Sequence, residues 1–184
     1  MTSTAFGRGT RPETHDHGSD GYHACCIYSS DHERRLHLTR FVSEGIRAGE
    51  KVICATYDST IEDLLADLAS AGLDPATLTD SRQLVIVTST EAYVEGGCFS
   101  VERALQRIED RIVEAKEEGY PGVRTTGDMM WMEGLPGTRD AFLEYEARVN
   151  RIIEAHGSSA LCLYDRNHFS AANLLHCLSV HPVA

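Results

Sequence analysis

Short apolar runs alternate with segments of helical periodicity, and this alternation constrains the fold more than any other feature of the sequence. The runs are residues 23–28, 51–57, 84–88, 123–126 and 160–164, and a segment with apolar residues at helical spacing follows each one. This order is typical of a mostly parallel sheet with helices on both faces. We therefore predict an α/β fold with three layers and a central sheet of about five or more strands.

The third run, Leu84-Val-Ile-Val-Thr88, has no polar residue in alternation, which predicts a strand buried on both faces. Residues 89–99 follow it and contain two consecutive glycines between Tyr93 and Phe99. Two interpretations are open for this stretch. It is either a mobile lid over the sheet edge or an ordinary loop with two aromatic anchors.

Composition excludes several classes of function. The net charge of −11, from 17 basic and 28 acidic residues, argues against direct nucleic-acid binding because nothing offsets repulsion from phosphates. No apolar run approaches the ~20 residues of a membrane span, and no signal peptide is evident. Six cysteines without a signal peptide favour free thiols and a cytoplasmic protein. Residues 1–21 lack hydrophobic periodicity and are predicted to be a disordered tail before a single domain at 22–184.

A candidate site follows from the predicted sheet. Gly119 and Pro121 end a charged helix, residues 123–126 form a strand, and Asp128 comes just after it. Ligands bind at the carboxyl edge of such sheets, so Asp128 is the first candidate for the floor of a site. The residues that follow the other strands should share this rim. The predicted ligand-binding set is Tyr28, Asp58, Asp128, Met129, Trp131, Tyr164, Asp165 and Arg166.

The first strand is not followed by a phosphate-binding loop. Residues 29–38 read SSDHERRLHL, without the glycines that would let backbone amides surround phosphates. Nucleotide turnover by the usual route is therefore not expected. We predict no catalytic residues and no cofactor, and the chain is not expected to be an enzyme.

Histidines and cysteines leave a metal or haem site as an alternative. No CxxC or HxxxH pair occurs, so the spacing does not match a structural zinc motif. Small buried cysteines in strands explain most of the pattern. If a metal or haem is bound, the candidate ligands are His23, Cys25, Cys162 and His168. A catalytic Cys–His pair is a further alternative.

Several segments together resemble the MEDS domain, a sensory domain named after methanogens, methylotrophs and the dichloromethane-responsive regulator. The resemblance covers residues 23–182 and rests on His23-x-Cys-Cys-Ile-Tyr28, Gly96-x-Cys-Phe99, Arg124-x-x-Gly-Asp-Met-x-Trp131, Tyr145-Glu-Ala-Arg-x-Asn150, Leu161-Cys-x-Tyr-Asp-Arg-x-x-Phe169 and His181-Pro182. It implies a RecA/KaiC-like core that lacks a phosphate loop. It also implies sensing of small hydrocarbon derivatives in bacterial signalling and transcription regulation.

The resulting hypothesis is a non-enzymatic sensory domain that binds a small, partly apolar ligand at the rim. Relatives of the family carry kinase, DNA-binding or anti-sigma partner domains, so we expect output through a separate kinase, anti-sigma factor or transcription regulator. No membrane contact is expected, and exposed sheet edges and helix faces are compatible with a homodimer. The alternatives are a metal- or haem-dependent sensor or enzyme, and a ligand-free interaction module.

Overall fold

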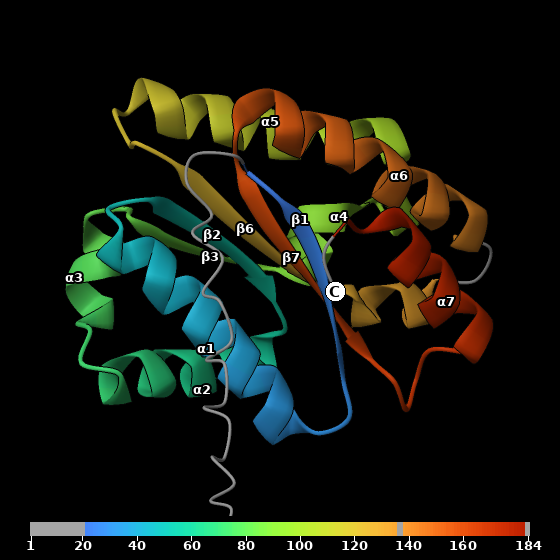
Figure 1. Cartoon of the computed structure of the whole chain (residues 1–184), viewed down its shortest axis with the longest axis horizontal. Coiled ribbons are helices and arrows are strands. Elements are labelled where there is room, and N and C mark those ends of the chain that lie inside the picture. Colours follow the sequence, from blue (N-terminus) through green and yellow to red (C-terminus); the bar gives the residue numbers. More distant parts are fainter. Residues whose placement is uncertain (1–20, 136–137, 183–184) are drawn as a thin grey trace, which may run out of the picture.

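Five parallel strands form the central sheet of the computed structural model, which describes residues 21–135 and 138–182. Of the predicted tail at residues 1–21, residues 1–20 lie outside this range. The strand order is β1-β7-β6-β2-β3 (Figure 1). The strands are β1 His23–Tyr28, β2 Lys51–Thr56, β3 Leu84–Thr88, β6 Val123–Asp128 and β7 Ser159–Asp165. The predicted α/β fold with a parallel sheet is confirmed.

Helices cover both faces of the sheet, as predicted. In Figure 1, α1 (Asp31–Arg47) and α2 (Asp58–Ser70) lie below the sheet, and α5 (Val101–Glu117) and α6 (Arg139–His156) lie above it. The last helix, α7 (Ala171–Val180), packs on the same face as α6 through Leu174 and Cys177. A short α3 (Pro75–Asp80), not predicted from the sequence, lies against β3.

Local signals end the helices where the sequence indicates. Gly119, just after α5, has a φ of 90°, and Gly157 caps α6 in the left-handed conformation with a φ of 57°. These positive φ values suit glycine because it has no Cβ atom. At the N-terminus of α1, Ser30 is the N-cap, and its hydroxyl accepts a hydrogen bond from the Glu33 amide.

The prediction that residues 84–88 are buried on both faces is wrong. In β3 only Leu84 is fully buried, at 1% exposed, and the other four residues are half-buried. The reason is position, because β3 forms the edge of the sheet and only β2 pairs with it. The strand buried along its whole length is β2, which lies between β3 and β6.

Residues 89–99 are more regular than the predicted loop, although Tyr93 and Phe99 pack against Trp131 as its two aromatic anchors, and a role as a lid stays a prediction. They form a short helix, α4 (Ser89–Tyr93), and a hairpin of β4 (Val94–Glu95) and β5 (Cys98–Phe99). A capping box begins α4, since the Thr88 hydroxyl and the Glu91 carboxylate each bond to the other residue's amide. We refer to residues 89–99 as the α4–hairpin segment.

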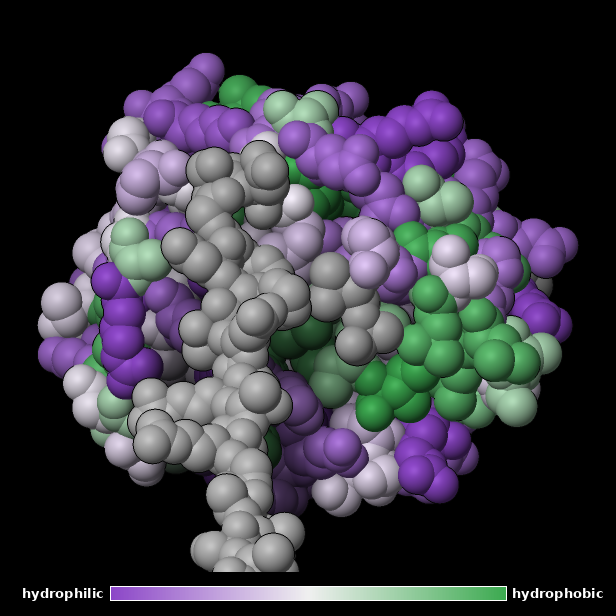
Figure 2. Space-filling view, in the orientation of Figure 1, coloured by the Kyte–Doolittle hydropathy of each residue, from purple (hydrophilic) through white to green (hydrophobic). Residues whose placement is uncertain are grey.

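The surface is mixed in character. Figure 2 shows hydrophobic surface gathered over α7, where the Leu175 and Leu178 side chains are exposed. All six cysteines are free, as expected from the sequence. Within the described residues, a search for a helix both long and apolar enough to cross a bilayer finds none.

Candidate functional site

Asp128 is buried at the carboxyl edge of the sheet, where the sequence places it. Its side chain is 2% exposed, and its carboxylate accepts a hydrogen bond of 3.2 Å from the Met130 amide. Burial raises the pKa of Asp128 to about 6, and the Met130 amide and the charge of Arg34 partly offset this. Arg34, on α1, is itself buried. Asp128 therefore gains its proton at a higher pH than an ordinary aspartate does.

Two more predicted residues lie beside Asp128. Tyr28 and Asp165 are register partners at the ends of β1 and β7. Burial raises the pKa of Tyr28 well above its usual value, and the charges of Asp128 and Asp165 raise it further. The pKa of Tyr57, which follows β2, is also raised by burial and by the charge of Asp128. The carboxyl ends of four strands thus meet at one rim, as parallel pairing requires.

The remaining predicted residues are placed differently. Met129, Trp131 and Tyr164 are buried in an aromatic and sulfur-rich cluster with Phe142 on the α6–α7 face, opposite Tyr28. Arg166 is exposed, and its amide donates to the Tyr28 carbonyl oxygen. Asp58 begins α2, but its side chain lies outside the described part of the chain. The ligand-binding role of all eight residues stays a prediction.

A cavity of about 40 Å³ lies between the sheet and helices α4 and α5, next to α6. Its walls are mainly apolar, with a few polar groups from β6 and α5. Apolar walls with few polar groups are typical of small-molecule sites. The lining includes Ile53, Ala92, Tyr93, Ala104, Ile108, Arg107, Arg111, Thr125, Tyr145, His23 and Cys162.

The α4–hairpin segment closes one side of this cavity. The Tyr93 ring stacks on the Trp131 ring with centroids 5.0 Å apart and meets Tyr145 edge-on at 5.8 Å. Tyr93 lies so close to β6 that a Cβ atom at Gly127 would be 2.2 Å from its hydroxyl oxygen. A glycine is therefore required at position 127 for this contact.

Arg107 ties the segment to α5. Its guanidinium donates to the Glu95 carboxylate at 2.8 Å and to the Glu91 carbonyl oxygen at 3.3 Å. Both bonds are exposed to solvent, where an ion pair contributes about 0.2–1 kcal/mol. The segment is thus ordered by its aromatic contacts, and weak polar contacts hold its outer edge.

A second hollow, of about 500 Å³, lies between α1 and α2 and is open to solvent. Arg35 in its wall pairs with Asp63 at 3.0 Å and with Asp67 at 2.6 Å. A partly apolar ligand would bury little of its surface in this charged and open hollow, so its binding would gain little free energy.

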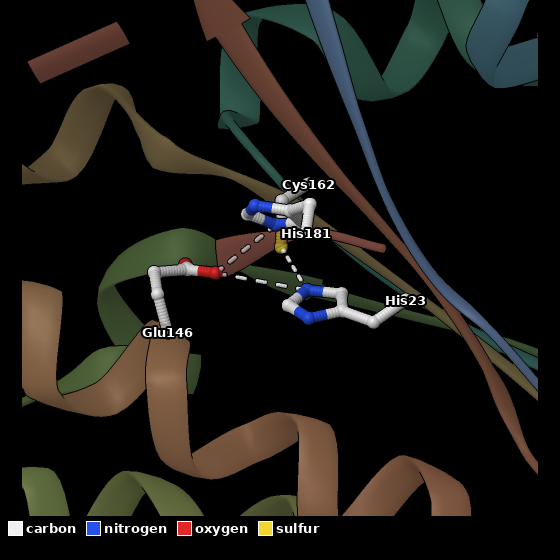
Figure 3. Close-up of side chains that lie close together, drawn as sticks. All are labelled: His23, Glu146, Cys162 and His181. Atoms are coloured by element: carbon white, nitrogen blue, oxygen red, sulfur yellow. Dashed lines mark hydrogen bonds and ion pairs between the residues drawn. The ribbon is translucent and has the colours of Figure 1, made fainter. Parts of the chain in front are cut away.

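Four potential metal ligands meet beside the cavity: His23, Glu146, Cys162 and His181 (Figure 3). They are all buried, and one donor atom from each lies within 4.8 Å of the others. The His23 Nε2 is 3.2 Å from the Cys162 sulfur and 3.6 Å from a Glu146 oxygen, which is 3.2 Å from the His181 Nε2. We call these residues the tetrad. Of the metal candidates predicted from the sequence, His23 and Cys162 belong to it, and Cys25 and His168 do not.

Burial sets the protonation of the tetrad. Burial lowers the pKa of His23 below its usual value, although Glu146 acts in the opposite direction. Burial and the neighbouring Glu146 raise the pKa of the Cys162 thiol well above its usual value. Without a cation, His23 is therefore neutral and Cys162 is a thiol at pH 7.

Hydrogen bonds at Nδ1 fix the orientation of the His23 and His181 rings. His23 Nδ1 is 2.7 Å from the Asn150 Oδ1, and Asn150 donates its own amide to the Val180 carbonyl oxygen at 2.7 Å. His181 Nδ1 is 2.7 Å from the Cys177 carbonyl oxygen. Both partners are acceptors, so each Nδ1 carries the proton and each Nε2 presents a lone pair to the tetrad. Metal-binding histidines are oriented in this way.

Sequence reasoning assigned no site role to Arg34, Glu146, Asn150 or His181, although the last three lie in segments that carry the family resemblance. One signal was available for Glu146, because it falls in the buried stripe of α6 with Phe142, Tyr145 and Val149. A carboxylate in an apolar helical stripe is rarely left unpaired. For His181 the signal was its place in the His181-Pro182 segment of the resemblance, but only the fold shows that it meets Glu146.

These features define an α/β domain without a phosphate loop, with a small apolar cavity and a buried cluster of metal-ligand type. The family model "MEDS: MEthanogen/methylotroph, DcmR Sensory domain" matches residues 22–182. The chain belongs to the MEDS family, a family of sensory domains, and the predicted resemblance is confirmed. A search of curated proteins finds no significant match.

Proposed function

We propose that this domain senses a small, partly apolar molecule that binds in the cavity beneath Tyr93. The observation that carries the proposal is the cavity itself, which is mainly apolar and adjoins a segment with few polar contacts to the core. Membership of a sensory family supports the general role. The cavity is a better candidate than the rim at Asp128 because apolar surface gains most from burial of an apolar ligand.

The size of the cavity limits the ligand. One ordered water needs roughly 10–15 Å³, so a cavity of about 40 Å³ holds a molecule of a few non-hydrogen atoms. This fits the simple hydrocarbon derivatives that the resemblance implies. Thr125 and the two arginines of α5 offer polar groups for a hydroxyl, carbonyl or halogen substituent.

The α4–hairpin segment would transmit the signal by changing its conformation when the ligand binds. A ligand that contacts Tyr93 favours one arrangement of this segment over another, and only such differential affinity can shift a conformation. We propose a non-enzymatic cytoplasmic role with a kinase, anti-sigma factor or transcription regulator as a separate partner. A RecA/KaiC-like origin of the core stays a prediction of the resemblance.

Trp131 provides the test because it is the only tryptophan and stacks on Tyr93. Short alcohols, aldehydes, amines and halogenated methanes are screened by melting temperature and by Trp131 fluorescence. We expect one chemical class to raise the melting temperature and alter the emission. Ala104→Leu, which fills the cavity, should abolish both effects, and Asp128→Asn at the rim should keep them.

Two outcomes contradict the proposal. If no compound changes either signal in the folded protein, the domain has no ligand of this kind. If Asp128→Asn abolishes binding and Ala104→Leu retains it, the ligand binds at the rim instead. Near-ultraviolet circular dichroism shows whether each variant keeps its packed core.

A further inference from the structure

The tetrad is too polar for its surroundings unless something else occupies its centre. Among the described residues, both Glu146 oxygens and the His181 Nε2 are buried and make no hydrogen bond, and the polar contacts of Glu146 Oε2 and His181 Nε2 are ion-pair distances of 3.2 and 3.6 Å within the tetrad itself. Leaving such groups unsatisfied costs about 1–3 kcal/mol each, and more for a charged group. The four side chains point toward one another from α6, β1, β7 and the residue after α7 (Figure 3). These atoms therefore need a common partner.

The hydrogen bonds behind the tetrad identify what kind of partner is missing. Each imidazole directs an Nε2 lone pair inward, because Asn150 and the Cys177 carbonyl accept the Nδ1 protons. In the neutral state, the His181 lone pair and a Glu146 carboxylate oxygen face each other at 3.2 Å. Two electron-rich atoms at that distance repel, and either a proton held between them or a bound metal cation removes the repulsion.

We propose that His23, Glu146, Cys162 and His181 bind one divalent transition-metal ion, with zinc the best match to this donor set. Imidazole nitrogen, thiolate sulfur and carboxylate oxygen are the three donor types that zinc accepts in proteins. With Glu146 and Cys162 both deprotonated, a divalent ion makes the buried group electrically neutral. A neutral group avoids most of the cost of charge in an apolar core.

The distances suit a tetrahedral ion. Zinc–ligand bonds of about 2.0–2.3 Å give a tetrahedron with edges of about 3.3–3.6 Å. The three measured donor pairs are 3.2, 3.6 and 3.2 Å apart, and every pair lies within 4.8 Å. Donors this close leave no room for a porphyrin plane between them, so a single ion fits and haem does not.

The arrangement indicates a structural site. Four protein ligands complete a tetrahedral shell, whereas a catalytic zinc keeps one position open. The ion would join the residue after α7 to α6 and to two neighbouring strands, β1 and β7. His23 and Cys162 also line the cavity, so the ion would stiffen one cavity wall. This inference does not depend on whether a small molecule binds there.

A nucleophilic cysteine is the competing explanation, because hydrogen bonds link the Cys162 thiol to His23 and His23 to Asn150. A cysteine nucleophile needs a lowered thiol pKa, and the carboxylate of Glu146 beside Cys162 acts in the opposite direction. The metal site uses Glu146 and His181, and the nucleophile does not. The two ideas therefore predict different effects of Glu146→Gln.

The test uses the purified full chain, prepared without a metal-affinity column, reduced and freed of metal by chelation. Titration with Co²⁺ should give one equivalent of bound ion, with visible ligand-field bands and a thiolate-to-cobalt charge-transfer band. Zn²⁺ should displace the cobalt and remove both signals. Cys162→Ser should lose the charge-transfer band, and Glu146→Gln should weaken binding by at least about 100-fold. Asn150→Ala, which acts through His23, should weaken it by about 10- to 100-fold.

Cys54→Ser is the matched control, because the Cys54 thiol is equally buried but faces the opposite side of the sheet, beside Thr126. It should bind cobalt like the wild type. The proposal is overturned if the folded wild type binds less than about half an equivalent, or if Cys54→Ser and Cys162→Ser lose the signals equally. Rapid alkylation of Cys162 that Zn²⁺ does not slow, and that Glu146→Gln accelerates, would instead support the nucleophile.

Discussion

The Nε2 atom of His23 lies 3.2 Å from the sulfur of Cys162, although 139 positions separate the two residues in the chain. Parallel pairing of β1 with β7 produces this contact. His23 pairs in register with Ala160, and Cys162 is two residues further along the same strand, so both side chains point to the same face. Glu146 on α6 and His181, the residue after α7, then approach from this face. The sheet register therefore decides whether the tetrad exists.

Removal of metal should lower the stability of the domain. An ion present at 100 times its dissociation constant stabilises the folded state by about 2.7 kcal/mol. For a domain of this size, that corresponds to a fall in melting temperature of roughly 5–10 °C on chelation. Calorimetry with and without chelator measures the change, and added Zn²⁺ should reverse it. In Cys162→Ser the chelator should have almost no effect; an equal fall there would mean that the tetrad is not responsible.

Asp128 should make the domain less stable as the pH rises. Its pKa is about 6 in the folded state against 3.8 for an unperturbed aspartate, so the folded state binds more protons between these values. Unfolding free energy must then decrease as the pH rises from about 4 to about 7, by about 3 kcal/mol from this group. Urea titrations at several pH values measure the slope. Asp128→Asn keeps an acceptor for the Met130 amide and should flatten the slope; an unchanged slope would assign it to other groups.

Gly127→Ala should disturb the closure of the cavity. The new Cβ atom would be 2.2 Å from the Tyr93 hydroxyl oxygen and 2.4 Å from the Met129 methyl carbon. Overpacking of this kind costs about 1–3 kcal/mol. Denaturant unfolding should show the loss, and Trp131 emission should change because Tyr93 moves. Adding Tyr93→Phe removes the closest atom and should restore part of the stability, whereas strictly additive effects would contradict this contact.

Arg107→Ala should loosen the α4–hairpin segment without a large effect on global stability. The lost contacts to Glu95 and Glu91 are exposed, so the unfolding free energy should change by less than about 1 kcal/mol. Hydrogen exchange of residues 89–99 should nevertheless speed up, since local opening depends on local contacts. Arg148→Ala, which removes exposed pairs with Glu102 and Glu144, is the control and should leave this segment unchanged.

Much of the fold could be predicted from local patterns. The first and third strands begin and end where the apolar runs do, and Gly119 and Gly157 end their helices as expected. The edge position of β3 could not be predicted, because an apolar run indicates burial but not how many neighbours a strand has. The helix and hairpin in residues 89–99 were missed because two glycines suggest a loop and equally suit a tight turn.

The candidate site was less accessible to sequence reasoning. The carboxylate at the sheet edge was identified correctly in position, since parallel strands bring their carboxyl ends together. Trp131 and Tyr164 were grouped with it by their nearness to strand ends, but residues of a strand such as Tyr164 alternate between two faces, and Trp131 lies in the 3-10 helix Met129–Gly134 that follows β6. Both rings pack on the α6–α7 face, away from Tyr28.

The sequence alone determined the layers of the protein, because hydrophobic periodicity and helix caps act over a few residues and can be identified locally. Tertiary structure alone decided which distant side chains meet. Strand order, register and helix packing depend on the whole chain folding at once, and they bring His181 to Glu146 and Tyr93 to Gly127. The chemistry of this domain therefore follows from contacts that no local pattern encodes.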